Sequence, residues 1–227
     1  MIPARIGSER LTKKNLINID GKPLLHYAID LAKNCRIFDG IYVNGDDDTF
    51  KEIAEKEGVS YYSRPKHLGS ASASSDEVVY DFLRYHKTDI LCWLNSVSPL
   101  LDIEELKGGI SYFNEENLDS MIASEIQVGH ANYNGKPLNY NKEEKFARTQ
   151  DLQQVELFCY SFMAWKSNVF KTCFEERGYG LMCGKFSTYP VSKLSAIKVK
   201  TIDDANIIDT IMKVRKNNSK LSYYKQI

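Results

Sequence analysis

The sequence predicts one α/β domain over residues 1–227, with a mainly parallel sheet flanked by helices on both faces. Three observations support this prediction. Short apolar runs alternate with helical patterns along most of the chain. No internal repeat or low-complexity linker divides the sequence, and its 227 residues are within reach of a single core. Ligands of such sheets bind beyond the carboxyl ends of the strands, so the turn after the first strand is the expected site.

The first half of the chain repeats this alternation four times. Residues 1–4 predict a short strand, and "PLLHYAIDLAKN" after them has the apolar spacing of a helix. The following strand and helix pairs are "GIYVNG" with "DDTFKEIAEKEG", "VSYYSR" with "SSDEVVYDFLRYHK", and "DILCWLN" with a helix over 102–114.

The pattern changes after the next apolar run, "DSMIASEIQ". Residues 129–154 are polar and contain Asn-Gly and Lys-Pro turn signals, which predict an excursion over the site or toward a partner subunit. The strand "LFCYSFMAW" and the helix "SNVFKTCFEE" then return to the sheet. A strand "SAIKVKT" over 195–201 and a helix over 203–217 are expected to complete it.

Composition narrows the class of partner and the compartment. The 30 basic and 30 acidic residues cancel, so no global basic field favours nucleic acid and local clusters become informative. The 5 cysteines lack Cys-x-x-Cys spacing and several sit in apolar runs, which indicates buried thiols in a cytoplasmic protein. We expect neither export nor membrane spanning, because no signal-peptide pattern or long apolar stretch is present.

The segment "IPARIGSERLTKKN" gathers cations and a Gly-Ser pair directly after the first strand: Arg5, Gly7, Ser8, Arg10, Lys13 and Lys14. A turn between a strand and a helix presents unpaired backbone N–H groups, and the Gly-Ser pair lets the backbone approach an anion. Full charges on Arg5 and Lys14 then neutralise phosphates, which predicts a nucleoside triphosphate site. An ordinary solvated turn is the alternative, because the segment is neither a Walker sequence nor GxGxxG.

The segment "IPARIGSERLTKKNLINIDGKPLLHYAI" resembles the N-terminal signature of the cytidylyltransferases that activate acidic sugars, the CMP-sialic acid synthetase and CMP-Kdo synthetase group. Four further segments follow in that family's order: "NGDDDTFKEIAEKEGV", "SRPKHLGSASASSDEVV", "LNSVSPL" and "IKVKTIDDANII". The resemblance implies a Rossmann-like nucleotidyltransferase (GT-A-like) fold in one domain. It also implies a homodimer built by exchange of the excursion at about residues 129–154.

The predicted nucleotide-binding set, which combines the resemblance with the residue patterns, is spread over four segments: Arg5, Gly7, Ser8, Arg10, Lys14, Asn15, Arg64, Ser74, Ser75 and Asn95. Arg64 would hold phosphate bidentately, so Arg64→Ala is expected to weaken nucleotide binding without unfolding the protein, as for an exposed arginine. Capping of the next helix is the alternative for Ser74 and Ser75, and we expect Ser75 to do both jobs.

The segment "LNSVSPLL" departs from the family, which has Gln where this chain has Asn95 and Arg where it has Leu101. Asn95 keeps the amide that reads the cytosine edge but is one methylene shorter. With Asn15 it predicts a preference for CTP over ATP and GTP. Leu101 lacks the positive charge that the family's arginine has at this position.

The magnesium aspartates of the family appear here as Lys198 and Lys200, if Thr201 and Asp204 keep their register. In this register the predicted catalytic set is Arg5, Lys14, Lys198 and Lys200. Strand alternation puts both lysines on one face, where they would contact phosphate or an acidic acceptor. Magnesium would arrive with CTP or rest weakly on Asp203 or Asp46, and a slipped register would make Asp203 the ligand.

Relatives bring an Arg and an Asn-Gly to the sugar from the strand after the excursion, where this chain has Leu157, Cys159 and Tyr160. Arg148 and Gln150 are therefore the candidate substrate-binding residues, with His130 as a further polar candidate. Each has an exposed loop position as its alternative.

The sequence thus predicts a CTP-dependent cytidylyltransferase, in which a hydroxyl of an acidic sugar attacks the α-phosphate of CTP and pyrophosphate leaves. Catalysis by positioning and charge neutralisation explains why cations dominate the predicted site. Two alternatives stay open. One is a catalytically degenerate relative that binds nucleotide or sugar as a binding or assembly protein, and the other is an enzyme with a different acid as its acceptor.

Overall fold

A computed structural model describes residues 1–8 and 10–216 of the chain. Its helices are α1 (Leu24–Cys35), α2 (Asp48–Lys56), α3 (Ser75–Tyr85), α4 (Ile103–Glu115), α5 (Ser167–Arg177), α6 (Lys193–Ala196) and α7 (Ile202–Lys216), with 3₁₀ turns η1 (Lys14–Leu16), η2 (Lys66–Gly69) and η3 (Thr149–Asp151). Its strands are β1 (Ile2–Ala4), β2 (Asn18–Ile19), β3 (Lys22–Pro23), β4 (Tyr42–Gly45), β5 (Ser60–Ser63), β6 (Ile90–Leu94), β7 (Ser120–Gln127), β8 (Asn132–Tyr133), β9 (Lys136–Pro137), β10 (Val155–Lys166) and β11 (Phe186–Pro190).

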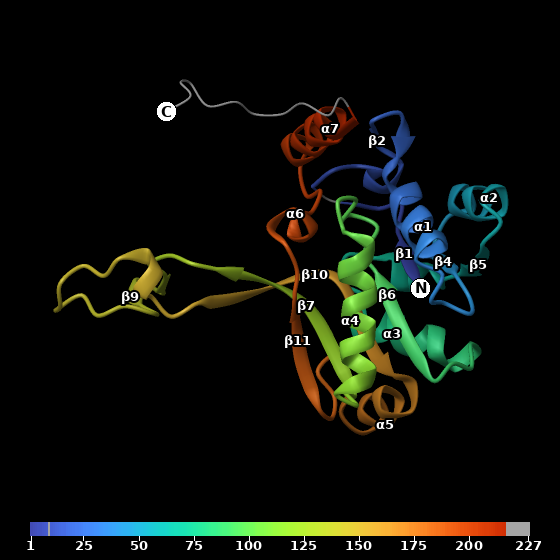
Figure 1. Cartoon of the computed structure of the whole chain (residues 1–227). Coiled ribbons are helices and arrows are strands. Elements are labelled where there is room, and N and C mark those ends of the chain that lie inside the picture. The colour runs from blue at the N-terminus through green and yellow to red at the C-terminus, as the bar shows by residue number, and fades with distance from the viewer. Residues whose placement is uncertain (9, 217–227) are drawn as a thin grey trace.

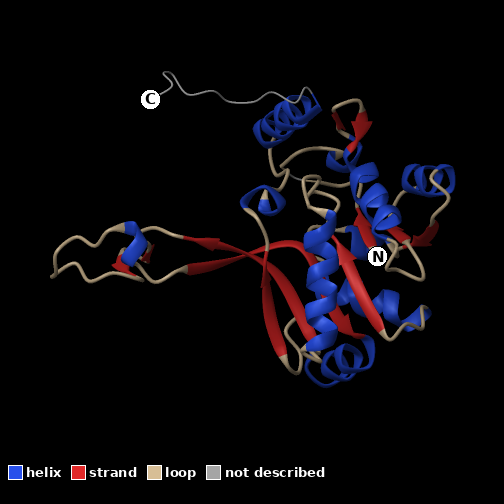
Figure 2. Cartoon of the chain, viewed as in Figure 1, coloured by secondary structure: helices blue, strands red, loops and turns tan. Residues whose placement is uncertain are grey.

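Two sheets form the centre of the molecule and continue into one another (Figures 1 and 2). One has the order β1-β4-β5 and is parallel, and the other has the order β11-β7-β10-β6. In the second sheet β11 runs parallel to β7, whereas β10 is antiparallel to both of its neighbours. The Met1 ammonium donates to the Cys92 carbonyl at 2.7 Å and the Leu94 N–H donates to the Met1 carbonyl at 3.0 Å, so β1 adjoins β6.

Helices cover both faces of the sheet, as the sequence predicts. Helices α1, α2 and α4 pack on one face, with Leu25, Phe50 and Phe113 among their buried contacts. Helices α3 and α5 pack on the other, through Phe82 and Phe170. The α/β prediction with a parallel sheet and flanking helices is therefore confirmed. None of the described helices is long and apolar enough to cross a bilayer.

The segment over 195–201 is not the predicted strand. Residues 193–196 form α6, and the chain then runs irregularly past Val97, where the Val199 N–H donates to the Val97 carbonyl at 2.9 Å. Val199 is fully buried against α7, so the apolar alternation that predicted a strand marks packing against a helix. The strand at this edge is β11, which the sequence analysis missed. Helix α7 begins at Ile202, and Asn217 of the predicted helix lies outside the described residues.

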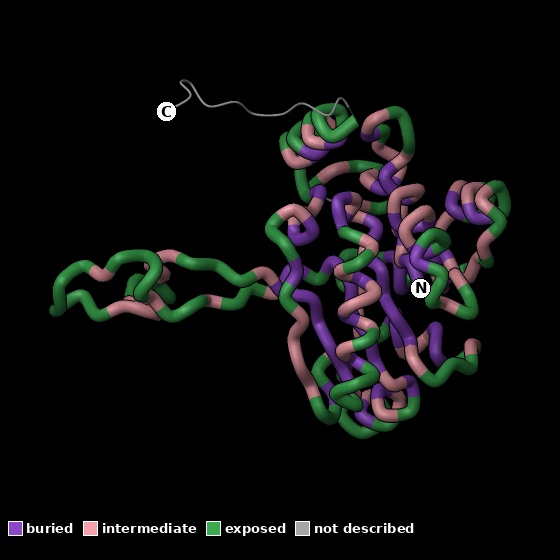
Figure 3. The backbone as a smooth tube through the Cα atoms, viewed as in Figure 1, coloured by how far each residue is buried: buried purple, intermediate pink, exposed green. Residues whose placement is uncertain are grey.

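The predicted excursion is a long arm (Figure 1). Strands β7 and β10 pair as far as Gln127 and Val155, and residues 128–154 extend from them away from the sheet. The short hairpin of β8 and β9 lies within the arm. Figure 3 contrasts the mostly exposed arm with the buried strands of the sheet. The arm has no core of its own, which fits a segment that contacts another surface.

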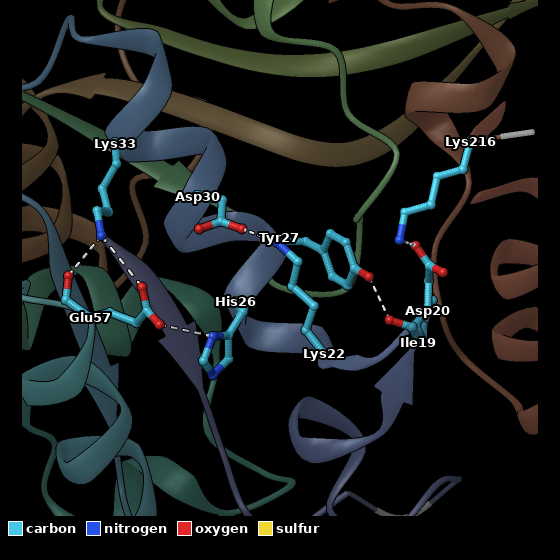
Figure 4. A network of polar contacts seen from close by, with 9 residues as sticks. All are labelled: Ile19, Asp20, Lys22, His26, Tyr27, Asp30, Lys33, Glu57 and Lys216. Atoms are coloured by element: carbon cyan, nitrogen blue, oxygen red, sulfur yellow. Dashed lines mark hydrogen bonds and ion pairs between the residues drawn. The ribbon is translucent and has the colours of Figure 1, made fainter. Parts of the chain in front are cut away.

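A polar network fixes the hairpin of β2 and β3 between α1 and α7 (Figure 4). The Tyr27 hydroxyl donates to the Ile19 carbonyl at 2.5 Å, and Asp20 pairs with Lys216 of α7 at 2.5 Å. On the same helix α1, His26 and Lys33 reach Glu57 at the end of α2, at 3.2 and 3.4 Å. Because these contacts fix the β2–β3 hairpin, they also support the cationic loop that precedes the hairpin in the chain.

Candidate active site

A cavity of about 340 Å³ opens beyond the carboxyl ends of β1 and β6. Six of the predicted site residues line it, and they come from four separate segments of the chain: Arg10, Lys14, Ser75, Asn95, Lys198 and Lys200. Its position agrees with the expectation for an open α/β sheet. The fold thus brings these predicted residues together around one space.

The cavity is strongly cationic. No aspartate or glutamate lines it among residues 1–8 and 10–216. Burial lowers the pKa of Lys14, and the nearby cations Arg10 and Arg5 lower it further, against an opposing effect of Asp204. Burial likewise lowers the pKa of Lys198, with Lys200 as the next cause. Cations that repel one another in this way are stabilised by a bound anion, so the cavity suits a polyanionic ligand.

Arg5, Gly7 and Ser8 lie in the loop beside the cavity without lining it. The Arg5 side chain donates to the Ser70 carbonyl at 3.1 Å and so ties the loop to the segment before α3. The Ile6 N–H donates to the Asp46 carboxylate at 2.9 Å. Gly7 is exposed and its Cα faces open space, which leaves its backbone accessible.

Asn15 does not line the cavity, contrary to the prediction that it binds the nucleotide. It is buried, its amide donates to the Arg5 carbonyl at 3.2 Å, and its oxygen accepts from the Ser96 hydroxyl at 2.7 Å. Both ends of the amide are therefore engaged within the protein. Asn15 holds the cationic loop against β6 and its following turn, and the reading of the base by Asn15 is corrected to this structural role.

Arg64 is not the exposed side chain that the sequence analysis assumed. It is only 5% exposed, its Nη2 donates to the Ala4 carbonyl at 2.6 Å, and its Nε has no hydrogen-bond partner among the described residues. Burial is the main cause of a lowered pKa of its guanidinium, and Asp46 opposes it. Arg64 thus supports the end of β1 from beneath the cationic loop.

Arg64→Ala is therefore expected to destabilise the protein, because it leaves the buried Ala4 carbonyl without its donor. The expected loss of unfolding free energy is about 1–3 kcal/mol. Thermal unfolding beside Arg84→Ala, which removes an exposed arginine from α3, measures it. Equal melting temperatures for the two variants would contradict the structural role of Arg64.

Ser74 and Ser75 divide the two jobs that were expected of Ser75. Ser74 is the N-cap of α3: its hydroxyl accepts from the Glu77 N–H at 3.2 Å, and Glu77 accepts from the Ser74 N–H at 2.7 Å. Ser75 is the first helical residue and lines the cavity. The prediction that Ser75 also caps is wrong, because the capping position lies one residue earlier, where the backbone is extended.

Asn95 lines the cavity directly after β6. Its amide donates to the Tyr160 carbonyl at 3.2 Å, which orients the side chain. Leu101, where the family has an arginine, is 8% exposed and packs into the core on the α1 face. The apolar residue at this position therefore contributes to packing rather than to the cavity.

No carboxylate that could hold magnesium lines the cavity within residues 1–8 and 10–216. Residues 1–8 and 10–216 contain no group of three His, Cys, Asp or Glu placed to hold a metal ion. Asp46 accepts from the Ile6 N–H and lies against Gly69, where a Cβ would stand 2.1 Å from its carboxylate. Asp203 is exposed in the first turn of α7 and does not line the cavity, which Lys198 and Lys200 do.

Arg148 and Gln150 lie on the arm, away from the cavity of their own chain (Figure 1). Both are exposed, and Arg148 pairs with Asp151 at 2.8 Å across η3. His130, also on the arm, stacks on Phe146 with 3.9 Å between the ring centres. The prediction that Arg148 and Gln150 bind substrate is corrected for the single chain, because the excursion extends outward instead of folding over the site.

Two aromatic residues of the cavity were missed as site residues. Trp93 of β6 is 8% exposed and its indole N–H has no partner among the described residues. Tyr160 of β10 lines the cavity beside Lys198. Neither carried a signal of its own, since an aromatic residue in an apolar strand is typical of the core.

The comparisons with known proteins agree with this geometry. The family model for Cytidylyltransferase matches residues 1–169. A pseudaminic acid cytidylyltransferase of Campylobacter jejuni is 32% identical over 68% of this chain and 72% of its own length. An N-acylneuraminate cytidylyltransferase of Streptococcus agalactiae is 28% identical over 90% of this chain, which spans 50% of that relative.

Solved structures share the fold at low sequence identity. A CMP:2-keto-3-deoxy-manno-octonic acid synthetase complexed with CTP matches with a TM-score of 0.71 at 15% identity, over 94% of this chain and 97% of that one. A 4-diphosphocytidyl-2C-methyl-D-erythritol synthase of Anaerococcus prevotii matches with a TM-score of 0.64 at 13% identity, over 93% and 96%. These likenesses establish the nucleotidyltransferase fold.

Proposed function

Because the chain belongs to the cytidylyltransferase family, we propose that it transfers CMP from CTP to a hydroxyl of an acidic sugar and releases pyrophosphate. The observation that carries the proposal is the cationic cavity at the carboxyl end of the sheet, lined by Arg10, Lys14, Lys198 and Lys200. The relatives are named for pseudaminic acid and N-acylneuraminate, and these names support an acidic sugar of that class as the acceptor.

In the proposed reaction the acceptor hydroxyl oxygen forms a bond to the α-phosphorus and its proton passes to solvent, while the bond between the α-phosphorus and the oxygen that bridges to the β-phosphate breaks. The electron pair of that bond leaves with pyrophosphate. Arg10 and Lys14 neutralise charge on the triphosphate, and the N-terminus of α3 at Ser75 adds its dipole. No covalent nucleophile is required, since positioning and charge neutralisation carry phosphoryl transfer chemistry.

Magnesium enters this proposal only as a companion of CTP. The cavity offers ammonium groups where a divalent cation would need carboxylates, so any magnesium arrives bound to the triphosphate. Lys14 and Lys200 then supply, from the protein, part of the positive charge that surrounds the phosphates. This arrangement favours a weak dependence of nucleotide binding on magnesium.

Pyrophosphate release from CTP with pseudaminic acid, N-acylneuraminic acid and 2-keto-3-deoxy-manno-octonic acid tests the function. Release that needs one of these acids is the expected result, with ATP and GTP as control nucleotides. CTP binding without release would favour the degenerate binding protein, and release with another acid would favour the different acceptor. Equal affinity for all nucleotides, measured by calorimetry, would contradict cytidine selectivity.

We further propose that the arm makes the protein a homodimer. The arm exposes apolar side chains far from the core of the sheet, with Tyr133 at 69%, Leu138 at 55% and Phe146 at 77% exposure. A second copy is the partner that the family resemblance favours, and burial of these side chains would stabilise it.

Phe146→Asp is expected to convert the dimer to a monomer, because a carboxylate would be desolvated in the contact. Light scattering during gel filtration measures the mass. Tyr85→Asp, which places a charge at another exposed aromatic position, at the end of α3, serves as the control. A monomeric wild type, or a dimeric Phe146→Asp variant, would contradict the arm as the contact.

All 5 cysteines are buried free thiols, and the cytoplasmic location stays a prediction.

A further inference from the structure

Tyr160 has a backbone conformation that is unusual for its side chain. Its φ is +56°, in the left-handed region, where glycine is favoured and a bulky residue is strained. It lies in an irregular part of β10: Phe158 pairs with Ser124 and Met163 with Ile122, so four residues of β10 face one residue of β7. Strained residues in bulges concentrate at functional sites, which directs attention to what the ring contacts.

Tyr160 lines the cavity, and its ring contacts the ammonium group of Lys198. The ammonium nitrogen of Lys198 lies 4.9 Å from the ring centre, which is within the range of a cation–π contact. Glycine at this position would satisfy the backbone and lose the ring. The tyrosine therefore fixes a lysine that would otherwise sample many rotamers.

The carbonyl of the same residue orients Asn95, whose amide donates to it at 3.2 Å. One strained residue thus holds two lining side chains, one through its backbone and one through its ring. The cavity cations come from different segments: Arg10 and Lys14 lie in the loop after β1, whereas Lys198 lies between α6 and α7, with its ammonium group over the Tyr160 ring. Two groups of cations suit two anions, the triphosphate and a separate carboxylate.

We propose that Tyr160 is a positioning residue that fixes Lys198 for the carboxylate of the acidic acceptor, so that the two residues form the acceptor side of the cavity. This inference rests on the proposed function, since it names which part of the same cavity takes which substrate. The triphosphate is bound by the first-turn cations together with Lys200, and the base lies toward Asn95.

Three variants of Tyr160 test this assignment. Tyr160→Phe keeps the ring and is expected to hold the acceptor KM within about twofold of wild type. Tyr160→Gly relieves the left-handed backbone, so its melting temperature is expected to equal or exceed that of wild type. The same variant is expected to raise the acceptor KM about tenfold or more while the Kd for CTP changes less than about threefold. Tyr160→Ala should lose both stability and acceptor affinity.

Asn134→Gly is the matched control, because it relieves another left-handed residue in the arm hairpin, outside the cavity. It is expected to leave both substrate constants unchanged. A wild-type acceptor KM in Tyr160→Gly would overturn the inference. An equal loss of CTP affinity in that variant would also overturn it, by assigning the ring to the nucleotide.

A spectroscopic measurement separates this inference from the proposed function. The side-chain methylene NMR signals of Lys198, assigned by their loss in Lys198→Arg, are expected to be shifted upfield by the ring. They should return toward ordinary lysine values in Tyr160→Gly and stay shifted in Tyr160→Phe. Unchanged signals in Tyr160→Gly would overturn the inference, whereas absence of pyrophosphate release with all three acids in wild type would contradict the proposed function.

Discussion

Lys14→Ala is expected to lower the affinity for CTP about 10- to 150-fold. This loss corresponds to the about 1.5–3 kcal/mol that a hydrogen bond to a charged group contributes. Lys14 is a half-buried lysine of the cavity, and it lies near Arg5 and Arg10, where a phosphate relieves the repulsion between like charges. Calorimetric titration with CTP measures the loss. Lys14→Arg should retain most of the affinity, because it keeps the charge.

The same titration has a predictable pH dependence. Burial first, and then Arg10 and Arg5, hold the pKa of Lys14 below its ordinary value in the free protein. The protonated form binds phosphate, so affinity is full at low pH and falls as the pH rises through this lowered pKa. A bound anion raises the pKa again, so CTP binding should take up protons in alkaline buffers.

The neighbouring Lys13 supplies the control for Lys14. It is exposed, does not line the cavity, and has a φ of +52°, a conformation that asparagine tolerates. Lys13→Asn should change the Kd for CTP by less than about threefold, the effect expected of a screened surface charge. Equal losses in Lys13→Asn and Lys14→Ala would indicate a diffuse field instead of a phosphate contact.

Lys200→Asp is expected to weaken CTP binding about tenfold or more when excess chelator removes magnesium, because a cation is replaced by an anion in a cavity lined by cations. Millimolar magnesium should restore part of the affinity, since the new carboxylate can contact a magnesium-bound triphosphate. Wild type is expected to bind CTP with and without magnesium at similar affinity. Titrations of both proteins under both conditions measure this.

Lys193→Asp is the matched control for Lys200→Asp, because it reverses the charge of an exposed lysine on α6 that does not line the cavity. It should behave like wild type in chelator and in magnesium. The opposite pattern, with wild type binding only in magnesium and Lys200→Asp behaving identically to it, would contradict the lysine register. Asp203 would then become the metal candidate.

Local patterns in the chain were enough to predict the fold class and the region of the site. The alternation of apolar runs and helical spacing predicts the α/β arrangement because each pattern reflects which face of an element is buried. The cations and the Gly-Ser pair after the first strand predict an anion site because the carboxyl end of a parallel strand directs the following turn toward ligands. The polar excursion was also evident, since residues 129–154 lack an apolar face.

The roles of individual side chains depended on long-range packing that no local pattern carries. Arg64 and Asn15 look like polar loop residues in the sequence, but contacts to Ala4 and Ser96 bury them. The segment 195–201 alternates like a strand, yet β11 occupies the edge of β7 and leaves Val199 to pack against α7. Hydrogen bonding of a sheet edge is a competition between segments distant in sequence, and its outcome depends on the whole chain. The strained Tyr160 beneath Lys198 is the same kind of feature, because neighbouring strands impose its backbone conformation.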